Sequence, residues 1–343
     1  MDRVVRVLIV DDSAFIRKVV RQMLSRSPYI EVVGAARDGE EALEQVEALR
    51  PDVVTLDLNM PRVDGLEFLK RQNALRPVPV VLLSIASESG ELVMKAFDAG
   101  AVDIVRKPTA LASDQVLQVA EELIAKVKAA ASARIPLPIP GGSELAARMP
   151  QQRLRTDVLV VGVSTGGPQA LKHLIPQFGL DFPIPIAVVL HMPVGYTELF
   201  ARSLGESSKL SVCEAKEGDQ LRPGVVLVAQ AGYHLTFQRS SDSVVRARLG
   251  LRPIDSLHRP SVDVMFRSAA EAYGDRTLGV VLTGMGSDGT DGAAWVKAQG
   301  GRIFTEAEES CVVYGMPRSV AEAGLSDACV PLSRMAKAII EAL

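Results

Sequence analysis

Three carboxylates stand where apolar runs of the sequence end. Asp11 and Asp12 directly follow the first run, and Asp57 follows the third. Because the carboxyl ends of parallel strands share one edge of a sheet, we expect these carboxylates to converge. Three close carboxylates repel one another unless a cation neutralises them, and an all-oxygen ligand set suits Mg²⁺. One such aspartate alone is commonly a solvated loop residue, but the repeated placement predicts a magnesium site.

A hydroxyl and an ammonium group follow the next two runs. Ser84 ends the fourth run, and Lys107 follows the fifth, just before Pro108. A hydroxyl and a fixed positive charge on the same sheet edge are the groups that a bound phosphoryl group requires. The first part of the chain therefore predicts a phosphoryl-binding site around an acidic pocket.

A second candidate site begins at segment 162–168, which reads Gly-Val-Ser-Thr-Gly-Gly-Pro. It carries G-x-S-x-G between an apolar run and residues at helical spacing, the pattern of a nucleophilic serine on a tight turn. The nearest alternative is a glycine-rich phosphate loop of a dinucleotide-binding fold. However, Ser164 occupies the position of the second glycine in G-x-G-x-x-G, and no lysine follows as in a P-loop.

A serine nucleophile needs a base, and the chain has four histidines. His191 directly follows an apolar run, which predicts that it lies on the same sheet edge as Ser164. His258 is the reserve candidate. We place His258 and His234 in irregular segments and His173 within a helix, facing away from the serine.

An orienting carboxylate comes from the glycine-rich segment 283–292. Asp288 is the nearer to the preceding apolar run, and Asp291 is the alternative. A flexible turn that caps the next helix is the other interpretation of this segment. Together, Ser164, His191 and Asp288 would form a triad, in a chain order unlike the Ser…Asp…His order of α/β-hydrolases.

Apolar runs that alternate with amphipathic helices must position these residues. The runs lie at Val4–Val10, Ile30–Val33, Val53–Leu56, Val80–Leu83 and Val102–Val105, and then at Val158–Val161, Ile184–Leu190, Val225–Val228, Leu278–Leu282 and Arg302–Phe304. This alternation predicts parallel sheets covered by helices on both faces. We therefore predict an α/β protein with an N-terminal (βα)5 domain and a C-terminal doubly wound α/β domain.

A proline-rich stretch from about residue 132 to residue 152 interrupts this alternation. Alternating prolines forbid a helix and favour an extended spacer. We place the first domain at 1–125, the end of its last helix and the linker at 126–152, and the second domain at 153–343. The length of 343 residues also favours two domains. In the second domain we expect a helix capped by Ser261 and stopped by Gly274.

Composition excludes several classes of protein. The net charge is −3, from 38 Lys and Arg against 41 Asp and Glu, so no basic field recruits nucleic acid. The three cysteines are scattered singly, which fits a reducing compartment. The apolar runs are too short to span a membrane, and the acidic N-terminal segment does not fit a signal peptide. We expect a cytoplasmic monomer that binds no nucleic acid and inserts into no membrane.

The acidic constellation over about residues 3–125 resembles the receiver domain of two-component response regulators. This resemblance implies that Asp57 is the phospho-acceptor. It also implies that Asp11, Asp12 and the backbone carbonyl of Asn59 hold Mg²⁺.

The same resemblance implies that Ser84 and Lys107 contact the phosphoryl oxygens. One residue departs from the family pattern: Ile104 stands three positions before the lysine, where the family often has an aromatic residue. This departure argues against an aromatic switch but not against phosphorylation.

The second domain resembles the catalytic domain of the chemotaxis methylesterase CheB family, the protein-glutamate methylesterases/protein-glutamine glutaminases. The resemblance covers residues 156–343, and the matching motifs lie at 162–168, 191–193, 258–263, 283–289 and 313–317. The order of receiver, linker and esterase is also that of the family. By motif match, Ser164, His191 and Asp288 are the family's triad.

The resemblance implies hydrolysis of glutamyl methyl esters on chemoreceptors, with deamidation of glutamine, under control of receiver phosphorylation. The histidine kinase CheA would be the phosphodonor, and the esterase would need no cofactor. The backbone N–H of Met285 would stabilise the oxyanion, and Thr165 would help to position His191. The alternative is a phospho-dependent signalling scaffold with an inactive esterase domain. A transcriptional regulator is disfavoured, since no helix-turn-helix or basic stripe is found.

Overall fold

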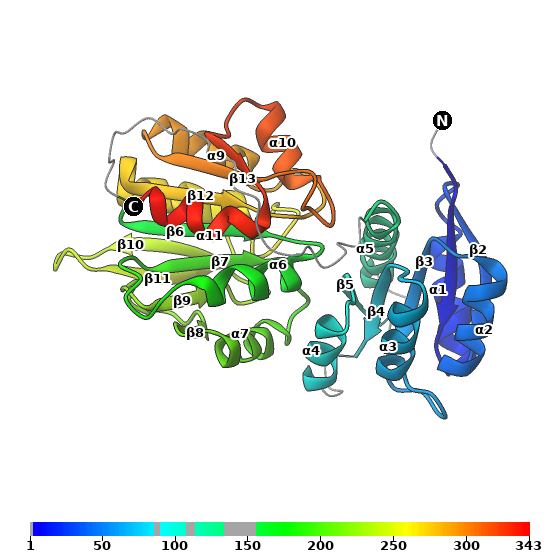
Figure 1. Ribbon diagram of the computed structural model, residues 1–343. Helices are drawn as coiled ribbons and strands as arrows, with labels where there is room; N and C mark the ends of the chain where they lie inside the picture. The colour runs from blue at the N-terminus through cyan, green and yellow to red at the C-terminus, as the bar shows by residue number, and fades with distance from the viewer. Residues whose placement is uncertain (1–2, 86–89, 108–113, 134–155) are drawn as a thin grey trace. The chain divides into compact units, whose positions relative to one another are not determined.

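The computed structural model describes residues 3–85, 90–107, 114–133 and 156–343. They form two compact units, one on a five-stranded sheet and the other on a seven-stranded sheet with an added hairpin (Figure 1). Of the linker predicted at 126–152, residues 126–131 belong to the last helix of the first unit. Residues 134–152 lie outside the described residues. No helix among the described residues is long and apolar enough to cross a membrane.

The first unit is a (βα)5 domain, as predicted. Its strands are β1 (Val5–Val10), β2 (Ile30–Ala36), β3 (Val53–Asp57), β4 (Val80–Ser84) and β5 (Asp103–Arg106), and its helices are α1 (Ala14–Leu24), α2 (Gly39–Leu49), α3 (Gly65–Leu75), α4 (Gly90–Asp98) and α5 (Asp114–Ala131). The strands pair in parallel in the order β2-β1-β3-β4-β5. Helix α1 packs against α5, and α3 packs against α2 and α4.

The strand order places a topological switch point between β1 and β3. From β1 the chain moves outward to β2, and it returns to β3 on the other side of β1. Loops that follow β1 and β3 therefore diverge, which leaves a crevice at the carboxyl ends of these two strands. Because β3 and β4 are buried along their whole length, they read in the sequence as uninterrupted apolar runs.

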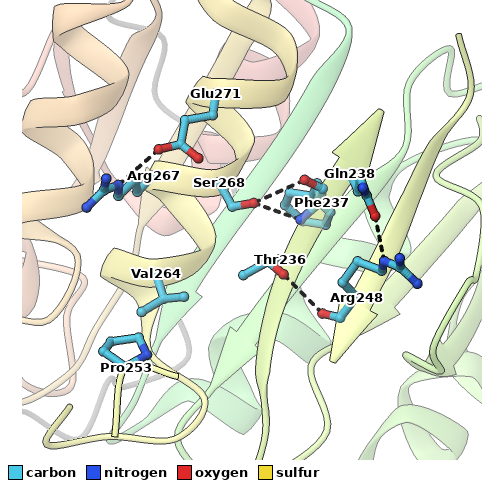
Figure 2. A pocket seen from close by; sticks show the side chains of 9 residues that line it. All are labelled: Thr236, Phe237, Gln238, Arg248, Pro253, Val264, Arg267, Ser268 and Glu271. Carbon is cyan, nitrogen blue, oxygen red and sulfur yellow. Dashed lines mark hydrogen bonds and ion pairs between the residues drawn. The ribbon is translucent and has the colours of Figure 1, made fainter. Parts of the chain in front are cut away.

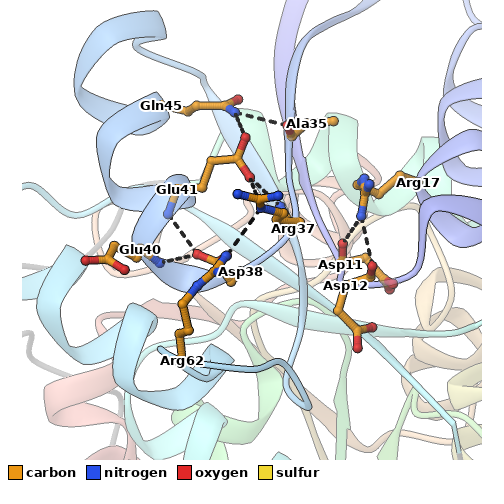
Figure 3. A network of polar contacts seen from close by, with 10 residues as sticks. All are labelled: Asp11, Asp12, Arg17, Ala35, Arg37, Asp38, Glu40, Glu41, Gln45 and Arg62. Carbon is orange, nitrogen blue, oxygen red and sulfur yellow. Dashed lines mark hydrogen bonds and ion pairs between the residues drawn. The ribbon is translucent and has the colours of Figure 1, made fainter.

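Buried Asp38 fixes the start of α2 and the loop that follows β3 (Figure 3). One of its oxygens accepts the N–H groups of Glu40 and Glu41, each at 2.9 Å, as an N-cap. Its other oxygen is paired with Arg62, whose backbone is left-handed with φ of 63°, and lies 3.9 Å from Arg37. This network ties the loop after β3 to the first turn of α2.

The second unit is a doubly wound α/β domain, as predicted. Its strands are β6 (Val158–Val163), β7 (Ile186–Leu190), β8 (Ser211–Glu214), β9 (Val225–Val228), β10 (His234–Arg239), β11 (Val245–Gly250), β12 (Thr277–Val281), β13 (Arg302–Glu306) and β14 (Ala328–Val330). Its helices are α6 (Gly167–Leu174), α7 (Thr197–Ser207), α8 (Val262–Tyr273), α9 (Thr290–Ala298), α10 (Met316–Glu322) and α11 (Leu332–Glu341), with short 3-10 turns η1 (Ile175–Gln177) and η2 (Gly274–Arg276).

The seven-stranded sheet is parallel and has the order β14-β13-β12-β6-β7-β9-β8. The chain moves from β6 to β7 in one direction and later reaches β12 on the opposite side of β6. Accordingly, α6 packs with α11, whereas α8 packs with α9. The carboxyl end of β6 is thus the switch point of this sheet, where open α/β folds place their ligands.

Strands β10 and β11 form an antiparallel hairpin outside the main sheet. The prediction that His234 lies in an irregular segment is wrong, because His234 begins β10 and is fully buried. The predicted cap of α8 is confirmed, since the Ser261 hydroxyl oxygen accepts the Val264 N–H at 3.4 Å. Gly274 ends that helix with φ of 62°, a conformation that favours glycine.

Candidate functional sites

The structure brings the three acidic residues of the receiver unit together. Asp11, Asp12 and Asp57 each offer a carboxylate oxygen, and these oxygens lie within 4.8 Å of one another. Asp11 and Asp57 are buried, whereas Asp12 is exposed. Arg17 donates to the backbone carbonyls of Asp11 and Asp12 at 2.7 and 3.0 Å, which holds the acidic turn in place (Figure 3).

Lys107 bridges the two buried carboxylates. Its ammonium nitrogen lies 2.9 Å from Asp11 and 2.8 Å from Asp57. Burial raises the pKa of both carboxyl groups, and the lysine opposes this shift through hydrogen bonds and charge. Burial would lower the pKa of Lys107 itself, but its bonds to Asp57 and Asp11 outweigh burial and raise it. The lysine therefore remains a fixed positive charge beside Asp57.

The other predicted residues of this unit surround Asp57. Asn59 donates its N–H to a carboxylate oxygen of Asp57 at 3.3 Å. Ser84 is buried at the end of β4, and its carbonyl accepts the Lys107 N–H at 2.9 Å. Ile104 is buried within β5. The site therefore combines an acidic pocket with a cation at the switch point, and the Ser84 backbone binds the residue that supplies this cation.

The donor set suits a divalent cation. Three carboxylates face a single ammonium group, so the pocket retains net negative charge when all three are ionised. All the candidate ligand atoms are oxygens, as Mg²⁺ prefers. Mg²⁺ is thus compatible with the residues present.

Ser164 follows the central strand of the second unit. Its N–H donates to the Thr283 carbonyl at 3.0 Å, and only 7% of the residue is exposed. Gly166 has φ of 78°, so the chain can turn sharply into α6. At Gly162, a Cβ atom would lie 2.8 Å from Val262 Cγ2, which explains the need for glycine there. The structure thus confirms a strand–turn–helix arrangement around this serine.

His191 lies beside Ser164 on the neighbouring strand. Val163 pairs with Leu190 in register, and the His191 N–H donates to the Val163 carbonyl at 3.2 Å. The Nε2 atom of His191 lies 2.8 Å from Asp288 Oδ2. Its other ring nitrogen, Nδ1, is buried and has no hydrogen-bond partner among the described residues. The serine and histidine are therefore adjacent without a hydrogen bond, and such bonds often tighten only when substrate is bound.

The Asp288 carboxylate is held by four hydrogen bonds. Besides His191, it accepts the Ser261 hydroxyl at 2.8 Å, the Val262 N–H at 2.7 Å and the Asp263 N–H at 3.0 Å. Burial opposes its ionisation, but the hydrogen bond and charge of His191, with the backbone donors, outweigh burial and lower its pKa. Asp288 is therefore an ionised carboxylate that fixes one side of the imidazole.

The alternative residues occupy other positions. Asp291 is exposed in the first turn of α9, and His173 is exposed on α6. His258 is not bonded to Asp288; instead its ring stacks on His191, with centroids 4.1 Å apart and planes inclined by 21°. Asp288 and His191 are thus the pair that the structure brings together.

Thr283 organises the loop that carries Met285. Its hydroxyl donates to the carbonyls of Thr165 and Val313 at 3.0 and 3.3 Å, and its N–H donates to buried Glu306 at 2.8 Å. Among the described residues, none accepts a hydrogen bond from the Met285 N–H. Thr165 is buried, and its carbonyl accepts the Thr283 hydroxyl.

Two residues around the triad were missed by sequence reasoning. Asp263 and Glu306 contact the backbone of the Asp288 loop. His258, the reserve candidate, stacks on the candidate base. A carboxylate at the end of β13 was a usable signal for Glu306, because the strand was predicted. Nothing in the sequence separates Asp263 from an ordinary acidic residue in the first turn of a helix.

An open groove of about 530 Å³ lies between the β10–β11 hairpin and α8 (Figure 2). Arg248 is bonded to Gln238 and Glu217, and Arg267 is bonded to Glu271. None of the triad residues lines this groove. Its charged groups are satisfied by one another, which gives no indication of a ligand.

Comparison with known proteins agrees with this architecture. Residues 7–120 match the family model of the response regulator receiver domain, and residues 159–339 match that of the CheB methylesterase. The chain is 50% identical over 335 residues to protein-glutamate methylesterase/protein-glutamine glutaminase 5 of Myxococcus xanthus, covering 96% of each chain. It is 41% identical to the protein-glutamate methylesterase/protein-glutamine glutaminase of Thermotoga maritima, covering 99% of each chain.

A solved structure matches the second unit. The crystal structure of the Thermotoga maritima CheB methylesterase catalytic domain is 40% identical, with a TM-score of 0.54. The match covers 55% of this chain and 100% of that one. Fold and comparisons together define a response regulator whose output domain is a hydrolase. The chain belongs to the CheB methylesterase family.

Proposed function

We propose that this protein hydrolyses γ-glutamyl methyl esters on chemoreceptors and deamidates glutamine side chains at the same site. Relatives that match nearly the whole chain carry both activities in their names. The observation that carries the proposal is the 2.8 Å contact between His191 and Asp288, at the strand end beside Ser164. This juxtaposition supports an acyl-transfer triad, in which the carboxylate orients the base beside the nucleophile.

In the proposed reaction, His191 takes the proton of the Ser164 hydroxyl as the serine oxygen attacks the ester carbonyl carbon. The tetrahedral oxyanion collapses, the bond to the methoxy oxygen breaks, and the imidazolium gives its proton to that oxygen, so that methanol leaves. Water then attacks the acyl-enzyme by the same route, which releases glutamate and restores the serine. For glutamine, ammonia leaves in place of methanol.

Two features of the loops support this chemistry. The Met285 N–H has no acceptor among the described residues, which leaves it available to the oxyanion. One such donor is typically worth about 3 kcal/mol of transition-state stabilisation. Ionised Asp288 would stabilise the imidazolium that forms during attack. Thr165 would help to position His191, and its carbonyl is tied to Thr283.

For the receiver unit, we propose that Asp57 is phosphorylated and that this raises esterase activity. A carboxylate oxygen of Asp57 would attack phosphorus, and the donor's bond to phosphorus would break. Mg²⁺, held by Asp11, Asp12 and the Asn59 carbonyl, would neutralise negative charge when bound. Lys107 lies 2.8 Å from Asp57 and would pair with a phosphoryl oxygen, as would the Ser84 hydroxyl.

The proposed partners follow from this assignment. The substrates are methyl-accepting chemotaxis receptors, and the phosphodonor is the histidine kinase CheA. The protein would act as a cytoplasmic monomer in chemotactic adaptation, with no cofactor for ester hydrolysis.

The test is methanol release from methylated receptor membranes by purified full-length protein. Ser164→Ala and His191→Ala should each lower the rate by at least about 10³-fold. His173→Ala, which changes an exposed histidine on α6, serves as the matched control. Demethylation that survives Ser164→Ala would exclude the triad and favour the scaffold alternative.

The regulatory part is tested separately. A small-molecule phosphodonor with Mg²⁺ should stimulate methanol release by the unaltered protein but not by Asp57→Asn. Equal stimulation of both proteins would exclude Asp57 as the acceptor, while leaving the triad assignment intact.

A further inference from the structure

At the N-terminal ends of helices α8 and α9, a carboxylate next to or within each helix accepts hydrogen bonds from the other helix. The N-terminal segment of α8 donates to Asp288, which precedes α9. In return, Asp263 in the first turn of α8 accepts the Gly289 N–H at 2.8 Å and the Gly292 N–H at 2.7 Å, both through Oδ1. Each carboxylate thus satisfies backbone donors that its partner helix leaves unpaired.

Helix α9 depends on this exchange because it has no cap of its own. Its N-cap residue is Gly289, with φ of 101°, and no side chain of the N-cap makes a hydrogen bond. Gly289 directly follows Asp288, so the donor held by Asp263 is one peptide bond away from the triad carboxylate. A shift of this N–H would move Asp288 with it.

Close packing fixes the same junction. A Cβ atom at Gly292 would lie 2.8 Å from Asp263 Cα and 2.6 Å from Phe266 Cβ. The two helices therefore approach to backbone contact at the point where Asp263 makes its hydrogen bonds. Such packing leaves little freedom for the loop between Asp288 and α9.

We infer that Asp263 is a positioning residue for catalysis: it holds the Gly289 and Gly292 N–H groups and so fixes the Asp288 carboxylate against His191. This inference rests on the proposed function, because Asp263 acts through the triad. It assigns Asp263 a geometric role, in which its oxygen accepts hydrogen bonds and its charge is dispensable. The charged and titratable groups around it are Asp288 and, beyond that carboxylate, His191.

Burial and the charge of Asp288 both favour the neutral form of Asp263, which supports a role that does not need a negative charge on Asp263. Burial raises the pKa of Asp263, and the Asp288 carboxylate adds to the shift, although the Gly292 and Gly289 N–H groups oppose it. Asp288 is the member of the pair that stays ionised, since His191 and three further donors stabilise its charge. An uncharged acceptor of the same shape should therefore replace Asp263.

The test compares Asp263→Asn, Asp263→Ala and Asp263→Glu with the unaltered full-length protein, by methanol release from methylated receptor membranes. Asp263→Asn retains the acceptor oxygen and should keep kcat within about 3-fold. Asp263→Ala should lower kcat by about 10–100-fold with KM nearly unchanged, because misplacing a catalytic group by 1 Å can cost about 10²-fold. Asp263→Glu, which displaces the oxygen but stays folded, should also lower kcat. Asp275→Ala, at an exposed aspartate beyond the end of α8, is the matched control.

The pH profile separates positioning from loss of folded protein. A smaller folded fraction scales the rate at every pH and leaves the shape of the profile unchanged. A misplaced Asp288 no longer supports His191 as the base, so the residual rate of Asp263→Ala should keep rising with hydroxide concentration. Trp295 fluorescence reports whether each variant is folded.

Two results would overturn the inference. One is kcat within about twofold of normal in folded Asp263→Ala and Asp263→Glu. The other is an Asp263→Asn protein as impaired as Asp263→Ala, which would mean that the charge matters. If these appear while Ser164→Ala is inactive, only the role of Asp263 fails; an active Ser164→Ala would refute the proposed function itself.

Discussion

The protonation of Glu306, which binds the backbone of Thr283, can be tested through the stability of the protein. Its side chain is fully buried at the end of β13, where it accepts the Thr283 N–H at 2.8 Å and the Ser310 hydroxyl at 2.9 Å. Burial raises its pKa above the ordinary value of 4.5, although these donors oppose the shift. We predict that Glu306→Gln stabilises the catalytic unit much more at pH 8 than at pH 5.

The sign follows from proton linkage. The folded protein holds the Glu306 proton more tightly than the unfolded chain does. The contribution of Glu306 to stability is therefore fully present when the pH is below its pKa in the unfolded chain, and it is lost as the pH rises through its pKa in the folded protein. At pH values above the folded pKa, each unit by which folding raises the pKa of Glu306 lowers the free energy of unfolding by about 1.4 kcal/mol. With a urea m-value of about 2 kcal/mol/M, one unit corresponds to a midpoint shift of about 0.7 M. Glutamine keeps an acceptor for Thr283 and does not titrate.

The assay is urea unfolding followed by tryptophan fluorescence at pH 5 and pH 8. Trp295 is the only tryptophan of the chain, and it lies in α9, so the signal reports the catalytic unit. Glu309→Gln, at an exposed glutamate of the same turn, is the control and should show no pH-dependent gain. A gap between Glu306→Gln and the unaltered protein that stays constant from pH 5 to pH 8 would refute this reasoning.

Three further predictions concern single contacts. Gly284→Ala should lower esterase activity by at least about 10-fold, because its Cβ would lie 2.8 Å from Ser164 Cβ; methanol release measures this. His258→Phe should retain kcat while His258→Ala loses about 5-fold, since the phenyl ring can replace the stacking on His191, which is worth about 1 kcal/mol; equal kcat values would argue against stacking. Asp38→Ala should destabilise the receiver unit by about 1–2 kcal/mol, because α2 loses its N-cap, and thermal unfolding checks this.

The parallel strands were readable from the sequence for a physical reason. β3, β4, β6 and β12 are buried along their whole length, so each appears as a short run made mostly of apolar residues. In the hairpin β10–β11, the apolar residues Leu235 and Phe237 of β10 are buried and alternate with polar residues, so no continuous apolar run marks the strand. Edge strands β8 and β14 are short and half-exposed, which leaves them without a clear signal.

The candidate triad was predictable because parallel strands deliver their ends to one edge. The supporting contacts were not. Asp263 and Glu306 bind backbone N–H groups that are 26 and 23 positions away along the chain. The sequence does not indicate which backbone N–H groups a distant carboxylate will bind, so these hydrogen bonds can be found only in the folded structure.

The strand order has a consequence for the making of the protein. His191 and Asp288 are 97 positions apart, and they meet only after β12 has joined the sheet beside β6. At roughly 5–20 residues per second, a ribosome adds Asp288 about 5–20 seconds after His191. A nascent or truncated chain that stops before β12 therefore carries the serine and the histidine without their carboxylate. If the proposed triad is correct, hydrolytic competence is therefore acquired late in synthesis, and incomplete copies of the chain lack it because of the strand order alone.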